Sequence, residues 1–104
     1  MKNSYQVRRA TINDLPHILS FIAQEAAESE WRTADINTLE MGIGTALRDE
    51  SIAIYRVLVD QYSQPVGCTS VVKEWRDWNA GYYWWIQSLF IDPKHRVQGL
   101  LNVM

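Results

Sequence analysis

The sequence is poor in the features that mark secreted, membrane-spanning and nucleic-acid-binding proteins. It has one cysteine, so no disulfide can form within the chain, and this indicates a cytoplasmic protein. Its apolar runs are far shorter than the ~18 residues that cross a bilayer, and the N-terminus lacks the apolar core of a signal peptide. Ten basic residues stand against twelve acidic ones, a balance that provides no cationic surface for nucleic acid or for an anionic membrane.

Glycine and proline are also scarce, with five and three copies in 104 residues, and no linker rich in Gly, Ser and Pro divides the chain. No internal repeat is present, so we expect one domain over residues 1–104. Apolar residues make up 47% of the chain, as in an ordered globular protein. Five tryptophans and five tyrosines are a heavy aromatic load for this length, and most of them lie in the C-terminal half.

The pattern of apolar residues predicts the order strand, helix, helix, strand, strand, strand. Helical spacing predicts one helix from Leu15, capped by Thr11–Asp14, and another over Ile36–Arg48, which Gly42 and Gly44 weaken. Alternation predicts strands over Tyr5–Ala10, Ser51–Asp60, Val66–Trp75 and Tyr82–Ile91. The fold class is therefore α/β in the mixed, α+β sense, a four-stranded antiparallel sheet with two helices on one face. A partial third helix begins near Gly99.

The residues after the last predicted strand have the character of a phosphate site. Asp92-Pro93 ends the strand, and a short loop with Arg96 and Gly99 leads into the third helix. Unpaired N–H groups gather at such a junction, where Gly99 permits close backbone approach and Arg96 adds a charge-assisted contact. An ordinary strand-to-helix connection is the alternative for the same residues, and spacing alone favours it.

Two stretches of the sequence resemble the GNAT-type N-acetyltransferases. Val7–Ile18 is similar to the opening strand and helix of that family. Trp84–Pro93, followed by Arg96-Val97-Gln98-Gly99, is similar to its central acetyl-CoA strand and pyrophosphate loop. The loop Glu74–Trp78, together with the paired tryptophans, resembles a tryptophan-rich bacterial branch of the family. The resemblance covers the whole chain, and its two ends agree in order and separation.

The resemblance implies the N-terminal half of the acyl-CoA N-acyltransferase fold, with acetyl-CoA as the cosubstrate, an amine as the acceptor and no metal. In the family, the fourth strand presents backbone groups to the pantetheine arm and the following loop binds the pyrophosphate. The implied cofactor-binding residues are Leu89, Phe90, Ile91, Arg96, Val97, Gln98, Gly99, Leu100 and Leu101. Leu101 departs from the pattern, because a small residue is frequent at that point. Since the family fold continues past the third helix, we expect a domain truncated in that helix.

The family reaction is the attack of a neutral amine on a thioester, which needs a proton acceptor and an oxyanion donor. Gln87 lies where members often carry a glutamate as general base, and a glutamine takes no proton near neutral pH. We therefore leave the catalytic residues unassigned. Glu28, Glu30 and Asp77 are carboxylates near the expected substrate loops that can act through water, although solvated surface charge is the better explanation for them.

Aromatic residues of the last two strands are candidates for an acceptor pocket, because aromatic faces bind apolar and cationic amines. The residues assigned to this role are Trp75, Trp78, Tyr83 and Trp85. Alternation predicts that about half of the aromatic residues in this region face the helices as core. We expect Cys68 to be a small buried apolar group rather than a nucleophile. His17 and His95 have no second histidine or cysteine nearby, so neither is expected to bind a metal.

Three functions are consistent with these patterns. The first is an incomplete acetyltransferase that needs another chain for activity, the second is a non-catalytic CoA-binding or interaction module, and the third is a structural remnant. A half-fold leaves the fourth strand and its apolar face uncovered. We therefore expect a homodimer formed through the fourth strand and the terminal helix, with a small-molecule amine as substrate and neither nucleic acid nor a membrane as partner.

Overall fold

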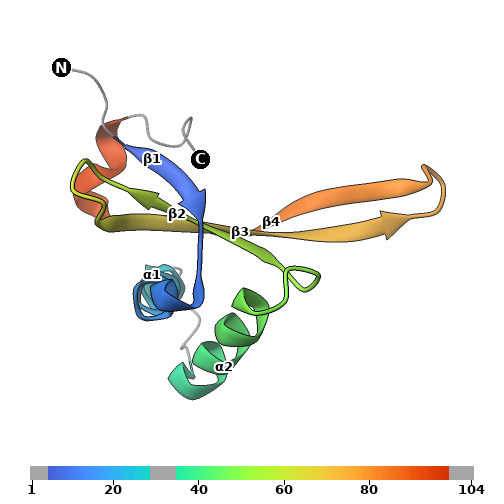
Figure 1. Cartoon of the computed structure of the whole chain (residues 1–104), viewed down its shortest axis with the longest axis horizontal. Helices are drawn as coiled ribbons and strands as arrows, with labels where there is room; N and C mark the ends of the chain where they lie inside the picture. The colour runs from blue at the N-terminus through green and yellow to red at the C-terminus, as the bar shows by residue number, and fades with distance from the viewer. Residues whose placement is uncertain (1–4, 29–34, 99–104) are drawn as a thin grey trace.

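The computed structural model of the chain describes residues 5–28 and 35–98. It contains a four-stranded sheet, two α-helices and two short 3-10 helices (Figure 1). The elements are β1 (Gln6–Arg9), η1 (Ile12–Asp14), α1 (Leu15–Glu28), α2 (Ile36–Leu47), β2 (Ile54–Val59), β3 (Pro65–Arg76), β4 (Gly81–Ile91) and η2 (Pro93–Gln98). The third helix expected from Gly99 lies outside the described residues. Within those residues, no helix is long and apolar enough to cross a membrane.

The four strands form one antiparallel sheet in the order β1-β2-β3-β4. Short turns join β2 to β3 and β3 to β4, while the two helices fill the connection between β1 and β2. This arrangement confirms the predicted meander and the mixed α+β fold class. Because each strand pairs only with its neighbours in this order, β4 forms one edge of the described sheet.

The start of α1 is fixed by a turn that the sequence pattern predicted only as a cap. Residues Ile12–Asp14 form the 3-10 helix η1, with Thr11 as its N-cap and the Asp14 carboxylate accepting from the Thr11 N–H at 2.8 Å. The Arg8 guanidinium donates two hydrogen bonds to the same carboxylate, at 2.8 and 2.9 Å. Asp14 is buried, so this ion pair satisfies a charge that would be costly to leave alone. It ties the end of β1 to the start of α1.

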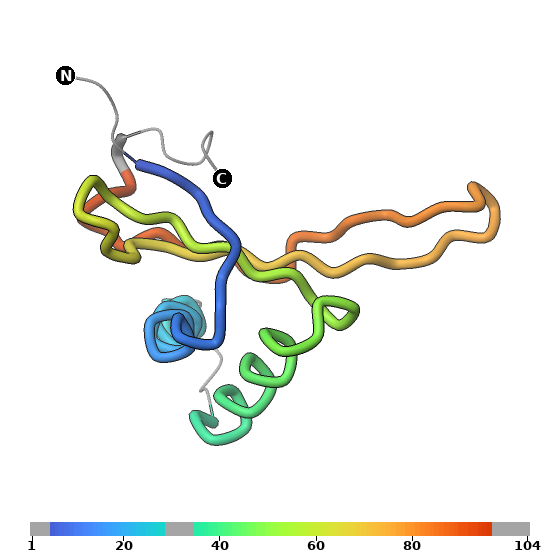
Figure 2. The backbone as a smooth tube through the Cα atoms, in the orientation of Figure 1, coloured from blue at the N-terminus to red at the C-terminus, as the bar shows by residue number. Residues whose placement is uncertain are grey.

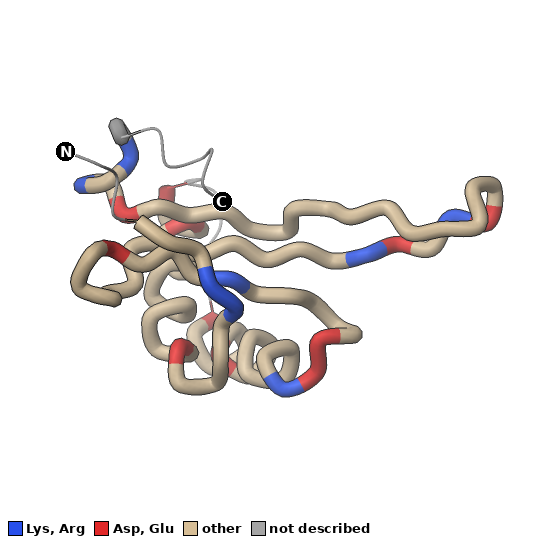
Figure 3. The backbone as a smooth tube through the Cα atoms, turned by 45° about the horizontal axis from the view of Figure 1, so that its top comes forward, with Lys and Arg blue, Asp and Glu red and all other residues tan. Residues whose placement is uncertain are grey.

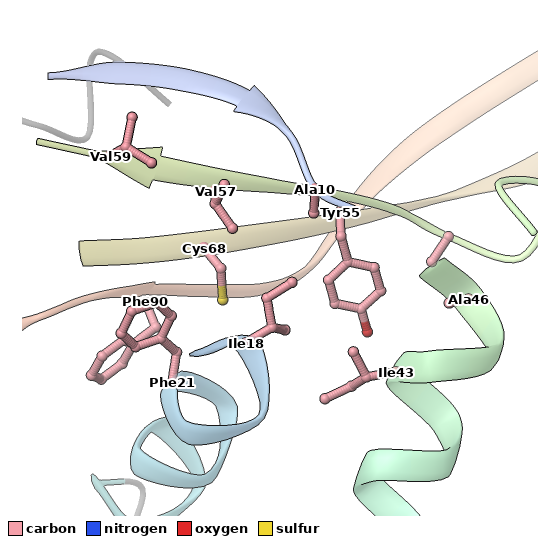
Figure 4. Packing of buried hydrophobic residues seen from close by; sticks show 11 residues of the cluster. Ala10, Ile18, Phe21, Ile43, Ala46, Tyr55, Val57, Val59, Cys68 and Phe90 are labelled. Atoms are coloured by element: carbon pink, nitrogen blue, oxygen red, sulfur yellow. The ribbon is translucent and has the colours of Figure 1, made fainter. Parts of the chain in front are cut away.

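Both helices cover the same face of the sheet, as the sequence predicted (Figure 1). Ile18 and Phe21 of α1 and Ile43 of α2 pack against strand residues that include Val57 and Cys68 (Figure 4). Phe21 stacks on a ring of β4, Phe90, with the ring centroids 5.5 Å apart. This layer of buried side chains is the main hydrophobic core.

The strand expected over Ser51–Asp60 begins three residues later than predicted. The Asp49 carboxylate accepts hydrogen bonds from the Ser51 N–H at 3.0 Å and from its hydroxyl at 2.6 Å. The Ile52 N–H donates to the backbone carbonyl of Asp49. Ser51 and Ile52 therefore lie in a turn rather than in β2, because local side-chain acceptors compete with the sheet for these backbone groups.

The far halves of β3 and β4 extend past the helices as a two-stranded hairpin, which Figure 2 shows as an arm leading away from the body of the molecule. The expectation that half of its aromatic residues are core is wrong. Trp75, Trp78, Tyr82, Tyr83, Trp84 and Trp85 are all exposed. Alternation sorts them onto two faces, but no helix among the described residues lies over either face at this distance from the body.

Candidate functional site

The edge strand β4 carries an irregularity at Gln87. Ser70 pairs with Ser88 and Val71 pairs with Ile86, so Gln87 stands between the two pairs without a partner in the ladder. A bulge of this kind bends a strand and redirects a side chain. The side-chain amide oxygen Oε1 of Gln87 accepts a hydrogen bond from the Ser70 hydroxyl at 3.2 Å. Gln87 therefore marks the boundary between the exposed arm and the part of β4 that contacts α1.

Leu89, two residues further along β4, presents its backbone N–H away from β3. This N–H donates to the Glu25 carboxylate of α1, with 3.3 Å between nitrogen and oxygen. The charge of Glu25 also raises the pKa of Cys68, although burial is the larger cause, and together they bring that pKa to about 12. A half-buried carboxylate therefore lies directly over the edge of the sheet.

Arg96 lies in η2, directly after β4, and its guanidinium donates hydrogen bonds to the end of β4 and to α1. Its Nε donates to the Ile91 carbonyl oxygen at 2.5 Å. One terminal nitrogen donates to both carboxylate oxygens of Glu28, at 2.9 and 3.1 Å. The guanidinium carbon also lies 5.0 Å from the centroid of the Phe90 ring. Backbone, carboxylate and ring together fix the cation beside the β4 edge.

These groups surround a cavity of about 310 Å³ between α1 and the end of β4. Its lining residues are Glu25, Glu28, Leu89, Phe90, Ile91 and Arg96. The structure thus brings together Leu89, Phe90, Ile91 and Arg96 of the expected cofactor site. The backbone of Val97 and Gln98 completes η2 next to Arg96. Gly99, Leu100 and Leu101 lie outside the described residues.

A second, larger cavity of about 430 Å³ lies on the other side of α1, between α2 and the sheet. Its walls come from α1, α2, β2, β3 and the Gln87 position of β4. The lining residues are Ile22, Ala26, Asp35, Thr38, Leu39, Gly42, Ile43, Ala46, Ile52, Ala53, Tyr55, Val72 and Gln87. Burial raises the pKa of the Tyr55 phenol, and a hydrogen bond with Ser70 partly opposes this. Apolar side chains dominate this cavity.

The aromatic residues expected at the acceptor site lie elsewhere. Trp75 and Tyr83 are on the exposed arm, Trp78 is 94% exposed in its turn, and none of them lines either cavity. Two of them contact nearby charges: the Trp85 indole donates to Glu74 at 2.7 Å, and Arg76 lies over the Tyr83 ring. Their role in acceptor binding stays a prediction.

The other residues named from the sequence are three carboxylates, the histidines and Cys68. Glu28 is exposed but ion-paired with Arg96, Asp77 lies in the turn of the arm, and Glu30 is outside the described residues. His95 shares a 2.5 Å hydrogen bond with the Tyr5 hydroxyl. Across the described ranges, no three His, Cys, Asp or Glu side chains gather as a metal site requires. Cys68 is buried, as predicted.

Sequence reasoning missed Glu25, whose carboxylate accepts a hydrogen bond from the backbone of the β4 edge. A local signal was available, because Glu25 and Glu28 follow the apolar stripe of α1 at helical spacing and lie on one side of it. Their partners, however, are 64 and 68 residues away in the chain.

Comparison with known proteins identifies the family of this fold. The model of the acetyltransferase (GNAT) family matches residues 13–101. The chain belongs to this family. The match includes α1, the sheet from β2 to β4 and the loop that follows Arg96. No curated protein matches the sequence closely enough to count as a relative.

Solved structures of other proteins share the fold of this GNAT chain. A possible acetyltransferase from Clostridium difficile is 32% identical with a TM-score of 0.88, and the match covers 94% of this chain and 64% of that one. A predicted acetyltransferase from Clostridium acetobutylicum, solved with acetyl-CoA, is 15% identical with a TM-score of 0.74, over 94% and 66% of the two chains.

An integron cassette protein from the mobile metagenome of Cole Harbour Salt Marsh is 18% identical with a TM-score of 0.82, over 91% of this chain and 61% of that one. At this low identity, the likeness to the salt-marsh and Clostridium acetobutylicum structures shows the fold alone. The GNAT chain described here spans 61–66% of the length of these three proteins.

Proposed function

We propose that this chain forms the acetyl-CoA-binding part of an enzyme that transfers an acetyl group from acetyl-CoA to an amine. The observation that carries the proposal is the cavity at the end of β4, where the Leu89 N–H of a sheet edge and the Arg96 guanidinium lie around one space. A backbone donor and a nearby cation suit a ligand that combines carbonyl groups with phosphates. Membership of the GNAT family supports this choice of ligand.

In the proposed reaction, the amine nitrogen attacks the thioester carbonyl carbon. The C–N bond forms, the C–S bond breaks, and the proton that nitrogen loses is finally carried by the sulfur of CoA. Leu89 donates its N–H to the carbonyl oxygen as negative charge develops there. Glu25 holds that N–H before the ligand binds, and the arriving carbonyl displaces its carboxylate only to a neighbouring position. We assign the role of proton acceptor to Glu25, because its carboxylate stays next to the thioester and because Gln87 cannot be protonated near neutral pH.

Release of the CoA thiol in the presence of an amine panel tests this function. Cys68 does not disturb a thiol assay, because it is buried and its pKa is about 12. Glu25→Gln keeps the shape of the side chain but removes the proton acceptor, so we expect turnover to fall by about 10²-fold or more.

Acetyl-CoA that binds without thiol release from any amine would favour the non-catalytic CoA-binding module instead. Full turnover by Glu25→Gln would remove Glu25 from the mechanism. Glu40→Gln is the matched control, because Glu40 is an exposed carboxylate of α2 that lines neither cavity.

We also propose that two copies associate through the β4 edge and the arm, in the cytoplasm. A two-stranded ribbon is only marginally stable in water on its own. The arm exposes Trp75, Tyr82, Tyr83, Trp84, Trp85 and Ile86. The four that share one face are Trp75, Tyr82, Trp84 and Ile86. At on the order of 100 Å² each, they offer roughly 400 Å² per copy, about half of the roughly 800 Å² per partner of a stable interface, and pairing of the β4 edges adds to this area.

The arm also carries charges of both signs. Basic and acidic segments both lie along it (Figure 3), from Lys73 and Glu74 to Arg76 and Asp77. Three of these charges lie on β3 and Asp77 lies in the turn rather than on the β4 edge, and Glu74 and Arg76 pair within the chain, so the exposed aromatic side chains are the support for this association. The terminal helix, which the sequence also placed at the interface, lies outside the described residues.

A further inference from the structure

The peptide bond between Ser88 and Leu89 carries a hydrogen bond at each of its two polar ends. The N–H and the C=O of a trans peptide bond point in opposite directions. The Leu89 N–H donates to Glu25 at 3.3 Å, beside the cofactor cavity. The Ser88 carbonyl oxygen accepts a hydrogen bond from the Thr69 hydroxyl of β3 at 3.0 Å. A side chain of β3 is therefore linked, through one peptide unit, to the N–H that we propose as the oxyanion donor.

The ladder between β3 and β4 is irregular directly before this peptide, because Gln87 has no partner in it. Thr69 and Ser70 are consecutive residues of β3, so their side chains leave the strand on opposite faces of the sheet. The Ser70 hydroxyl lies 2.6 Å from the Ser88 hydroxyl, while Thr69 binds the Ser88 carbonyl oxygen. Ser88 is thus held by side chains from both faces immediately after the bulge.

The hydrogen bond from Thr69 is shielded from water. Thr69 is 8% exposed and Ser88 is 7% exposed, and the β-branched side chain of a threonine has few rotamers that could move its hydroxyl away. Hydrogen bonds in a chain polarise one another, so a donor at the carbonyl oxygen makes the N–H of the same peptide a stronger donor. The Thr69 hydroxyl is placed both to orient the Leu89 N–H and to strengthen it.

We infer that Thr69 is a positioning residue for acetyl transfer. Through the Ser88 carbonyl, its hydroxyl aims the Leu89 N–H at the thioester oxygen and strengthens this donor as negative charge develops there. The inference rests on the proposed function, which places the thioester carbonyl at Leu89. Thr69 lines neither cavity, so it acts on the reaction only through the backbone of β4.

Three variants separate this role from an ordinary buried hydrogen bond. Thr69→Val removes the hydroxyl but keeps the shape of the side chain, and valine suits a strand. Thr69→Ser keeps the hydroxyl and should restore the parent behaviour. Thr45→Val is the matched control, because the Thr45 hydroxyl also donates to a backbone carbonyl, that of Met41 at 2.8 Å, on a helix position that lines neither cavity.

The first measurement needs no ligand and follows two NMR signals, the Ser88 carbonyl carbon and the Leu89 amide nitrogen. We expect both signals to move in Thr69→Val, to return toward the parent positions in Thr69→Ser, and to stay in place in Thr45→Val. The second measurement is the infrared stretch of bound acetyl-CoA, isotope-labelled at its acetyl carbonyl. The stretch should lie below its free frequency in the parent chain and in Thr69→Ser, and it should move back toward that frequency in Thr69→Val.

Turnover with the amine panel gives the third measurement. One oxyanion donor contributes about 10²–10³-fold to turnover, and a neighbouring hydrogen bond alters its strength by roughly 10–30%, so kcat should fall about twofold to eightfold in Thr69→Val. The KM for acetyl-CoA should stay within about twofold, because the lost strength matters most in the transition state. A purely structural role would lower the unfolding midpoint without moving the stretch of the bound carbonyl.

The outcomes distinguish failure of this inference from failure of the proposed function. A Leu89 signal and a bound-carbonyl stretch that Thr69→Val leaves unchanged overturn the inference, while acetyl-CoA binding leaves the proposed function intact. Equal effects of Thr69→Val and Thr69→Ser overturn the role of the hydroxyl. Acetyl-CoA that does not bind the parent chain, or whose carbonyl keeps its free frequency there, overturns the proposed function and, with it, the positioning role, even where the Leu89 signal responds to Thr69→Val.

Discussion

Arg96 donates hydrogen bonds to two groups of this chain, which a bound coenzyme must either join or replace. The Ile91 carbonyl fixes its Nε, while Glu28 holds the terminal nitrogen that faces the cavity. Both side chains of the Arg96–Glu28 pair are partly exposed, at 39% and 47%, and exposed pairs stabilise a fold by at most about 1 kcal/mol. A phosphate carries more charge than Glu28 and can therefore take over this contact.

Glu28→Gln is expected to strengthen acetyl-CoA binding. The substitution removes an anion from the phosphate end of the cavity and releases Arg96 from its competing partner. Since the exposed pair is worth at most about 1 kcal/mol, the expected gain in affinity is about twofold to fivefold. Titration calorimetry at low ionic strength measures it.

Glu50→Gln provides the control for that titration, because Glu50 is an exposed carboxylate that pairs with Arg9 far from the cavity. Unchanged or weaker acetyl-CoA affinity in Glu28→Gln would show that the phosphates do not reach Arg96.

At the scale of single elements, the junction between β1 and α1 depends on Asp14. Its carboxylate accepts from the Arg8 guanidinium and from the Thr11 N–H, and it is buried. Arg8 is the largest cause that holds the pKa of Asp14 below its ordinary value of 3.8, and burial acts in the opposite direction. The charged form is therefore the one that the folded state prefers.

Asp14→Asn should lower the free energy of unfolding at neutral pH by about 1–3 kcal/mol, because Arg8 loses its charged partner. A lowered pKa gives stability that is fully present above the unfolded value and is lost as pH falls through the folded one. The difference between the two proteins should therefore be constant above about pH 5 and shrink below the ordinary pKa of 3.8.

Urea unfolding followed by far-UV circular dichroism at several pH values measures this difference. A gap that persists unchanged at pH 2, or no gap at pH 7, would contradict the role given to the ion pair.

The sequence predicted the elements well where one residue pattern decides the outcome. Alternation placed β3 and β4 to within a residue at most ends, and helical spacing placed α1 and α2. Ser51 and Ile52 were misplaced because their backbone groups bond to Asp49, a local interaction that alternation does not register. The aromatic residues of the arm were misplaced for a different reason. A period of two tells which residues share a face, but not whether a helix is long enough to cover that face.

The candidate site could be predicted only in part. The strand and the arginine follow from residues that are close together in the sequence, and Leu89, Phe90, Ile91 and Arg96, which the sequence named, line one cavity. The contacts of Glu25 with Leu89 and of Glu28 with Arg96 join α1 to the far end of the chain. No local pattern reveals which residue of a helix meets which residue of a distant strand. The cavity beneath α2 requires five elements at once, and it was missed for the same reason.

At the scale of the whole molecule, the proposed dimer depends on the aromatic arm. Trp84 is 56% exposed near the middle of its β4 strand, so Trp84→Ser should weaken self-association by at least about tenfold, since aromatic residues carry much of the energy of an interface. Sedimentation velocity at tens of micromolar protein should find a dimer for the parent chain and a monomer for the variant.

Tyr62→Ser serves as the control, because Tyr62 is 72% exposed in the turn before β3, away from the arm. A folded monomer of the parent chain at that concentration, or a dimer that Trp84→Ser leaves unchanged, would contradict the proposed interface.

The cavity beside Arg96 carries the main proposal, that the end of β4 binds acetyl-CoA. Calorimetric titration of acetyl-CoA into the parent chain and into Arg96→Ala tests this most directly, with Arg56→Ala as the control on β2. We expect saturable binding to the parent chain and to Arg56→Ala, and an affinity at least about tenfold lower for Arg96→Ala. Binding that is absent from the parent chain, or that survives unchanged in Arg96→Ala, would contradict the assignment of this cavity to acetyl-CoA.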